Sequence, residues 1–167
     1  TADEHGLTRE AMDAFAIESL TRAQRAIDEG LNQKEIAPVT IRTRRGEHTV
    51  SVDEQPHKAN LEKIPQLRPA FAENGTITPA NSSSISDGAS ALLLASEQAV
   101  EAHGLTARAR IVAHSRNSLA PEAFTLAPIG AAEEVLAKAG WTVADVDLWE
   151  INEAFAMVTM LTVDALK

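Results

Sequence analysis

A polar junction near the C-terminus places the strongest constraint on the fold. Residues 146–149 have the composition of a short strand, and residues 154–166 form an apolar run typical of a helix. Asn152 lies between the two, where asparagine is a favoured N-cap and main-chain donors are unpaired. An amide at such a junction is suited to holding a water molecule or an oxyanion, and a simple N-cap role fits the same position.

The rest of the second half alternates between the two periodicities. We expect a helix over residues 89–102, a strand over residues 109–114 and a helix over residues 131–139. The first of these helices is apolar on several faces, so it should be buried on several sides, which is difficult in a lone domain of this size. The alternation of strand and helix predicts the α/β fold class.

The first half begins with an amphipathic pattern. Thr8 is a plausible N-cap for a helix that ends near Gly30. Strand-like alternation follows over residues 39–43 and 48–52, and the intervening turn contains Gly46. These patterns predict a surface helix followed by a β-hairpin.

Residues 53–81 carry many turn-forming residues and one short helical pattern at residues 61–67. So long an irregular segment is uncommon in a small domain unless it is functional. A small arginine cluster at the hairpin could meet a nucleotide phosphate, but a solvated hairpin tip explains it better. His57 has no metal-ligand spacing to another histidine, so we expect a loop histidine.

Composition excludes several functions. The net charge of −9 argues against nucleic-acid binding through a broad basic surface. No apolar run is long enough to span a bilayer and no secretory pattern precedes Thr1, so we expect a cytoplasmic protein that does not bind membranes. The chain contains no cysteine. It also starts without methionine and stops in a helical pattern, from which we expect a piece of a longer protein.

Five blocks in unbroken order resemble those of the thiolases, the thioester-dependent acyltransferases that form or cleave carbon–carbon bonds. They are residues 67–71, 75–78, 81–91, 128–129 and 152–156. The chain departs from the family's usual Gly-Pro-Ile-Pro motif at Ala127 and Gly130. The resemblance implies part of a layered αβαβα fold with an inserted loop domain. Residues 1–85 would belong to the loop domain, 86–107 would finish the N-terminal half, and 108–167 would begin the C-terminal half.

The resemblance also implies site residues. Asn152 would be catalytic, fixing a water that stabilises the thioester oxygen. Ser83 would contact the pantetheine of coenzyme A, although a loop that ends in a helix N-cap explains the same residue. The remaining residues implied at coenzyme A or the acyl tunnel are Phe71, Ala80, Phe124 and Phe155. For Phe124, core packing is an equal alternative.

The function implied is reversible acyl transfer, most simply acetyl transfer, between coenzyme A thioesters. Members of the family use a cysteine nucleophile, a second cysteine and a Gly-His-Pro histidine, none of which this chain contains. We therefore expect the chain alone to be inactive and to depend on the missing parts of a thiolase. Coenzyme A thioesters would be substrates, with no cofactor or metal, and the complete protein would form homodimers or homotetramers.

Two alternatives stay open. The chain could be a non-catalytic acyl-CoA-binding or assembly module derived from a thiolase half, which fits the absence of cysteine. A hydrolase built on His114 and Ser115 is a distant third, because the Gly-x-Ser-x-Gly elbow is missing.

Overall fold

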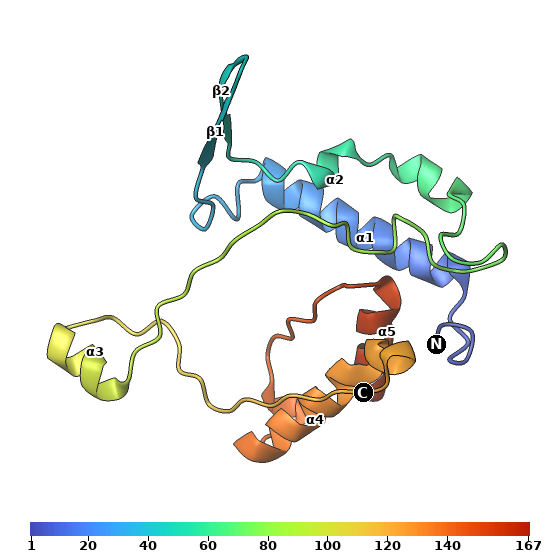
Figure 1. The fold of residues 1–167 in the computed structure, drawn as a ribbon. Coiled ribbons are helices and arrows are strands. Elements are labelled where there is room, and N and C mark those ends of the chain that lie inside the picture. The colour runs from blue at the N-terminus through green and yellow to red at the C-terminus, as the bar shows by residue number, and fades with distance from the viewer. The chain divides into compact units, whose positions relative to one another are not determined.

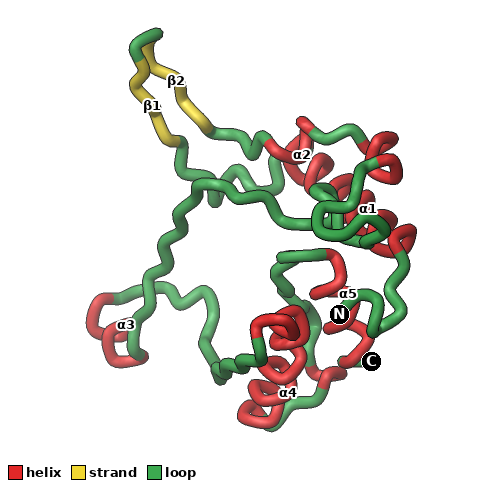
Figure 2. Tube along the Cα trace, turned by 45° about the vertical axis from the view of Figure 1, so that its right-hand side comes forward, coloured by secondary structure: helices red, strands yellow, loops and turns green.

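The computed structural model describes residues 1–167, which divide into two compact units. The N-terminal unit contains Ala2–Ser82 together with Phe155–Met157. The C-terminal unit contains Ser83–Ala154 and Val158–Lys167, with Thr1. Figures 1 and 2 show the helices and the single small sheet that these residues form.

Helix α1 (Arg9–Asp28) organises the N-terminal unit. The hydroxyl of Thr8 accepts a hydrogen bond from the main-chain N–H of Ala11 at 3.2 Å, which confirms the predicted N-cap. Met12 and Ala16 form the buried side of the helix. The helix ends where Gly30 takes a positive φ of 66°, a conformation that glycine adopts without steric cost.

The predicted hairpin is present. Strands β1 (Val39–Thr43) and β2 (Gly46–Val50) pair antiparallel, with Thr43 opposite Gly46. The two-residue turn is therefore Arg44-Arg45, and Gly46, with φ of 120°, opens the second strand directly after it. Arg42 forms a 2.8 Å ion pair with Glu47 across the strands, so this arginine contributes to the pairing of the two strands.

Two short helices lie against α1. They are α2 (Gln55–Lys58) and the 3₁₀ helix η1 (Leu61–Gln66), the second of which confirms the short helical pattern in this segment. Ile64 is 3% exposed and joins the core of the unit. A loop without regular elements then runs from Leu67 to Ser82.

The C-terminal unit is mostly helical. Its elements are α3 (Glu97–His103), the 3₁₀ helix η2 (Pro121–Leu126), α4 (Ala127–Ala139), the 3₁₀ helix η3 (Val143–Asp145) and most of α5 (Ala156–Ala165). Gly104 and Gly140 end α3 and α4 in the left-handed conformation. The buried residues Val158, Leu161 and Thr162 show that α5 supplies much of this unit's core. No helix is both long enough and apolar enough to cross a membrane.

The largest differences from the sequence prediction concern three elements. The helix predicted over residues 89–102 begins only at Glu97, and Leu92, Leu93 and Leu94 stay exposed in extended chain. The strands predicted over residues 109–114 and 146–149 find no partner strand, and the hairpin is the only sheet. The common reason is that an all-apolar helix depends on packing and a strand depends on a neighbour's hydrogen bonds, and no other part of this chain provides either.

Candidate functional site

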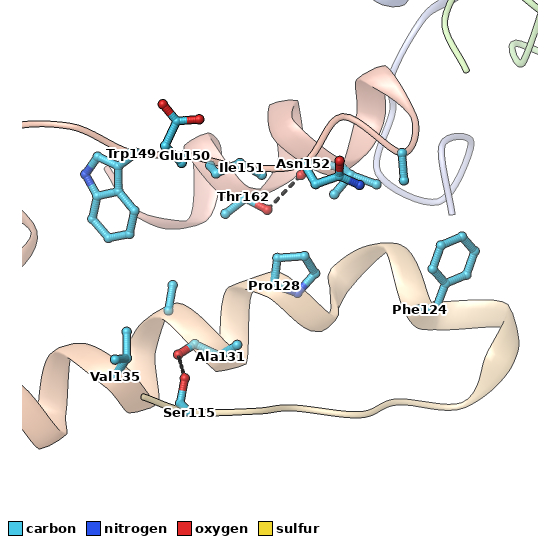
Figure 3. Close-up of a pocket in the computed structure, with 13 residues that line it drawn as sticks. Ser115, Phe124, Pro128, Ala131, Val135, Trp149, Glu150, Ile151, Asn152 and Thr162 are labelled. Atoms are coloured by element: carbon cyan, nitrogen blue, oxygen red, sulfur yellow. Dashed lines mark hydrogen bonds between the residues drawn. The ribbon is translucent and has the colours of Figure 1, made fainter. Parts of the chain in front are cut away.

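An open cleft of about 400 Å³ lies in the C-terminal unit (Figure 3). Its lining comes from the extended run before α5, from α5 itself, from η2 and α4, and from Ser115 on the segment before η2. The lining residues are Ser115, Phe124, Pro128, Ala131, Ala132, Val135, Trp149, Glu150, Ile151, Asn152, Ala154, Val158 and Thr162. Most of them are apolar, as expected where a ligand's non-reacting part is held.

The sequence explains the two walls of this cleft. Pro128 stands in the first turn of α4, where its missing N–H costs nothing and its fixed φ suits a helix start. Small alanines follow it on the cleft side of the helix, and Phe124 lies on the turn before it (Figure 3). Opposite, residues 149–152 run in extended conformation before α5 begins. Small side chains on one wall thus leave room for a ligand beside the other.

Few polar groups in the cleft have free donors. The Ser115 hydroxyl donates to the carbonyl of Ala131 at 2.6 Å, and the Thr162 hydroxyl donates to the carbonyl of Val158 at 2.7 Å. The side-chain amide of Asn152 is exposed and makes no hydrogen bond within the chain. The amide of Asn152 and the indole N–H of Trp149 are therefore the side-chain donors available to a bound ligand. No group of three or more His, Cys, Asp or Glu side chains is placed to hold a metal ion.

Asn152 is not the N-cap that the sequence suggested. Helix α5 begins four residues later, at Ala156, whose N–H donates to the carbonyl of Asn81 at 3.0 Å. The first main-chain N–H of α5 is therefore hydrogen-bonded to a carbonyl that is distant in sequence. The carbonyl of Asn152 accepts the N–H of Ala154 at 3.0 Å, so a local turn fixes its backbone while the amide stays available.

Ser83 lies against the segment that follows Asn152. Its N–H donates to the carbonyl of Ala154 at 3.0 Å, and its hydroxyl donates to the carbonyl of Glu153 at 2.6 Å. These two bonds join chain segments that are 70 residues apart in sequence. Two motifs singled out separately in the sequence therefore meet in the structure.

The other predicted site residues are distributed between the units. Phe124 lines the cleft and is half exposed. In the N-terminal unit, Phe155 is partly buried and forms an antiparallel bridge with Ser82. Phe71 is 79% exposed on the loop after η1, and the partly buried Ala80 donates its N–H to the hydroxyl of Thr78.

Sequence reasoning missed a buried polar cluster in the N-terminal unit. Asp13 and Asn81 are 4% and 3% exposed and are hydrogen-bonded to each other. A signal was available, because Asp13 falls on the same helix face as Met12 and Ala16, with Arg9 one turn before it. An ionisable residue on a buried stripe is unusual and needs partners.

Two family models together match almost the whole chain. The model described as thiolase, N-terminal domain matches residues 1–98, and the model described as thiolase, C-terminal domain matches residues 105–167. The chain belongs to the thiolase family. The order of blocks noted in the sequence is thereby confirmed as a family resemblance.

Individual thiolases show the same relation. The chain is 46% identical to an acetyl-CoA acetyltransferase of Yarrowia lipolytica over 96% of its length and 40% of the relative's. It is 44% identical to a cytosolic acetyl-CoA acetyltransferase of Mus musculus (92% of this chain, 39% of the relative), and 40% identical to a mitochondrial 3-ketoacyl-CoA thiolase of Bos taurus (93% and 39%). The chain thus spans about 40% of the length of these relatives. This fits the prediction that it corresponds to part of a longer thiolase.

Solved thiolase structures confirm the fold class. An acetyl-CoA acetyltransferase from Bacillus anthracis superposes with a TM-score of 0.94 at 37% identity, over 99% of this chain and 42% of that one. The Acat5 thiolase from Ascaris suum, solved in complex with coenzyme A, gives a TM-score of 0.90 at 36% identity with the same coverage. The chain is therefore part of a thiolase-like α/β fold.

Proposed function

We propose that the full-length protein containing this chain transfers acyl groups, chiefly acetyl, reversibly between coenzyme A thioesters, with formation or cleavage of a carbon–carbon bond. The observation that carries the proposal is the double hydrogen bond from Ser83 to Glu153 and Ala154. It holds the serine assigned to coenzyme A beside the segment of the amide assigned to catalysis. The names of the thiolase relatives support the same chemistry.

Asn152 supplies a hydrogen-bond donor for developing negative charge. Its amide is exposed at the cleft and its backbone is fixed by the bond from Ala154. We assign it to holding a water molecule against the thioester oxygen, where charge grows as the carbonyl is attacked. Removing a donor of this kind typically costs ~3–4 kcal/mol of transition-state stabilisation in other enzymes.

Ser83 has a defined hydrogen-bond polarity. Its hydroxyl proton is directed at the carbonyl of Glu153, so the oxygen offers its lone pairs to a ligand. The pantetheine of coenzyme A carries two amide N–H groups that can donate to such an oxygen. We therefore assign Ser83 as an acceptor for a pantetheine amide.

The remaining residues are assigned to binding rather than chemistry. Phe124 and Phe155 line the acyl tunnel, and Phe71 and Ala80 belong to the loop that covers coenzyme A. We place residues 1–85 in the loop domain, 86–107 at the end of the N-terminal half and 108–167 at the start of the C-terminal half. The break between the two family models, between residues 98 and 105, supports a division near this position.

The nucleophile is assigned to residues outside this chain. The chain contains no cysteine, so the acyl-enzyme forms elsewhere in the full-length protein, and these 167 residues do not turn over alone. We place the protein in the cytoplasm as a homodimer or homotetramer. The relatives include both a cytosolic and a mitochondrial member.

The test is an assay of the full-length gene product with acetoacetyl-CoA and coenzyme A. We expect cleavage to acetyl-CoA that depends on coenzyme A, and slow formation of acetoacetyl-CoA in the reverse direction. Saturable coenzyme A binding without turnover would instead favour a non-catalytic binding module. Absence of both binding and turnover would overturn the proposal.

A further inference from the structure

A hydrogen-bonded network in the N-terminal unit consists of the side chains of Arg9, Asp13 and Asn81. Nε of Arg9 donates to one carboxylate oxygen of Asp13 at 2.6 Å, within α1. Nη2 of the same guanidinium donates to the main-chain carbonyls of Ile64 and Leu67 at 3.1 and 2.9 Å. Leu67 ends η1, so Arg9 joins α1 to the residue where the next loop begins.

The network also holds the far end of that loop. The other carboxylate oxygen of Asp13 accepts from Nδ2 of Asn81 at 3.2 Å. The same Nδ2 donates to the carbonyl of Thr76 at 2.9 Å, and Oδ1 of Asn81 accepts the N–H of Thr78 at 2.8 Å. Asp13, Thr78 and Asn81 are each at most 4% exposed, and hydrogen bonds in such a low-dielectric interior are stronger than in water.

Between the two held ends lie residues 68–77, which we call the Phe71 loop. The N–H of Ala70 donates to the carbonyl of Ile77 at 2.8 Å, so the loop is closed by its own backbone. Phe71 is 79% exposed, so little of its ring is packed against the rest of the unit. The place of the ring is therefore set by the backbone of the loop, which the network holds at both ends.

We propose that Arg9 is a positioning residue for coenzyme A: with Asp13 and Asn81 it holds the Phe71 loop in the conformation that binds the ligand. The inference rests on the proposed function, because the loop is assigned there to covering coenzyme A. Every bond in the argument lies within the N-terminal unit. The proposal gives a role in binding to a residue of α1 that lies 58 positions before Leu67 in the sequence.

The expected signature is weaker binding of coenzyme A with little change in turnover. The Phe71 loop is assigned no contact with the reacting atoms, so its misplacement weakens substrate and transition state alike, which raises KM and leaves kcat nearly unchanged. Arg9→Lys keeps a cation beside Asp13, but one ammonium nitrogen replaces the planar fork that bonds the carboxylate and the two carbonyls. We expect Kd and KM for coenzyme A to rise about three- to tenfold, the range for one lost hydrogen bond.

Coupling to Phe71 distinguishes positioning from a general effect on the fold. Phe71→Ala removes the ring that the network positions, so a further change at Arg9 has no ring left to misplace. Arg9→Lys should therefore raise Kd by less than about twofold in a Phe71→Ala background. A purely structural loss would raise Kd by the same factor in both backgrounds.

The experiment compares these variants in the full-length gene product. Arg22→Lys is the matched control, because Arg22 pairs with Glu18 at 2.6 Å on the same helix but at an exposed position. Kd for coenzyme A is measured by calorimetry, KM and kcat by the cleavage assay, and Tm by a thermal melt. Hydrogen-exchange mass spectrometry of residues 68–78 follows the loop itself in the absence of ligand.

For Arg9→Lys the proposal predicts the higher Kd and KM, a kcat within about twofold of wild type, and faster exchange of residues 68–78. It predicts no change in any of these for Arg22→Lys. A folded Arg9→Lys protein with unchanged Kd or unchanged exchange would overturn the proposal. Equal factors in the wild-type and Phe71→Ala backgrounds would overturn it as well.

A second variant covers the case in which Arg9→Lys does not fold. Arg9→Gln retains a neutral donor for Asp13 and is judged by the same criteria, and failure of both variants to fold contradicts the proposal because the network then serves the fold alone. A wild-type protein that does not bind coenzyme A would overturn the proposed function and with it the ligand named here. The exchange experiment contains no ligand, so it separates that outcome from a failure of the network to hold the loop.

Discussion

The hydroxyl of Ser83 donates to the main-chain carbonyl of Glu153 at 2.6 Å, one residue after Asn152. A second bond, from the N–H of Ser83 to the carbonyl of Ala154, holds the same two segments together. The serine is thus anchored through its proton and free at its lone pairs. This polarity makes the proposed coenzyme A contact specific enough to test.

Replacing Ser83 by alanine removes both the anchor to Glu153 and the acceptor for pantetheine. We expect KM for coenzyme A to rise about three- to tenfold, since a neutral hydrogen bond typically contributes ~0.5–1.5 kcal/mol, while kcat stays within about twofold. Ser84→Ala is the neighbouring control, because the Ser84 hydroxyl contacts only that of Ser86. Equal effects of the two variants on KM would argue against a specific role for Ser83.

The start of α1 offers a test of the local fold. Thr8→Ala removes the N-cap bond to Ala11 and should lower the free energy of unfolding by about 1 kcal/mol. Thr21 is also exposed, but its hydroxyl donates to the carbonyl of Ile17 within the helix, so Thr21→Ala should be neutral or slightly stabilising. Urea denaturation followed by circular dichroism compares the two. A larger loss at Thr21 would contradict the assigned cap.

Gly130 departs from the family's usual Gly-Pro-Ile-Pro motif, and the side chain of Asn117 lies close to it. A Cβ added there would lie 2.3 Å from Nδ2 of Asn117, which donates to the carbonyl of Ala127 at 3.2 Å. Gly130→Ala should be nearly neutral, because a helix gain of about 0.5–1 kcal/mol is offset by loss of that exposed bond. In an Asn117→Ala background the same change should stabilise by about 0.5–1 kcal/mol. Equal effects in both backgrounds would rule out this coupling.

Asp145 provides a pH-dependent contact. The N–H and the hydroxyl of Thr142 both donate to its carboxylate at 2.7 Å, and these bonds hold the pKa of Asp145 below its ordinary value. A lowered folded-state pKa gives stability that is present above the unfolded-state pKa and lost as the pH falls through the folded one. Thr142→Val keeps the N–H but removes the hydroxyl, so the pKa of Asp145 should rise part of the way back. A carboxyl-carbon NMR titration measures it, and an unchanged pKa would contradict the assignment.

Elements with their own local signals were predictable from sequence. Thr8 and Gly30 mark the two ends of α1 and lie close beside the helix in sequence, and both were found at the predicted places. The apolar helix and the two strands of the second half were not, because each depends on partners that this chain does not contribute. Residues 92–94 are the clearest case, since a pattern typical of deep burial occurs in exposed extended chain.

The candidate site was likewise predictable from the sequence only in part. The sequence motifs identified Asn152 and Ser83 as separate residues of interest. The bond between Ser83 and Glu153 and the contact between Asp13 and Asn81 join positions 70 and 68 residues apart, and periodicity or local spacing carries no information about such pairs. The buried charge of Asp13 was visible as an exception on an apolar helix face, but only the structure shows which residue accommodates it.

The central claim is that the exposed amide of Asn152 stabilises charge during acyl transfer, and steady-state kinetics of Asn152→Ala in the full-length gene product tests it most directly. We predict that kcat for acetoacetyl-CoA cleavage falls about 10²-fold or more, with KM for coenzyme A changed by less than threefold. Asn32→Ala, at an exposed loop asparagine before the hairpin, should leave both unchanged. A folded Asn152→Ala protein that retains wild-type kcat would contradict the account.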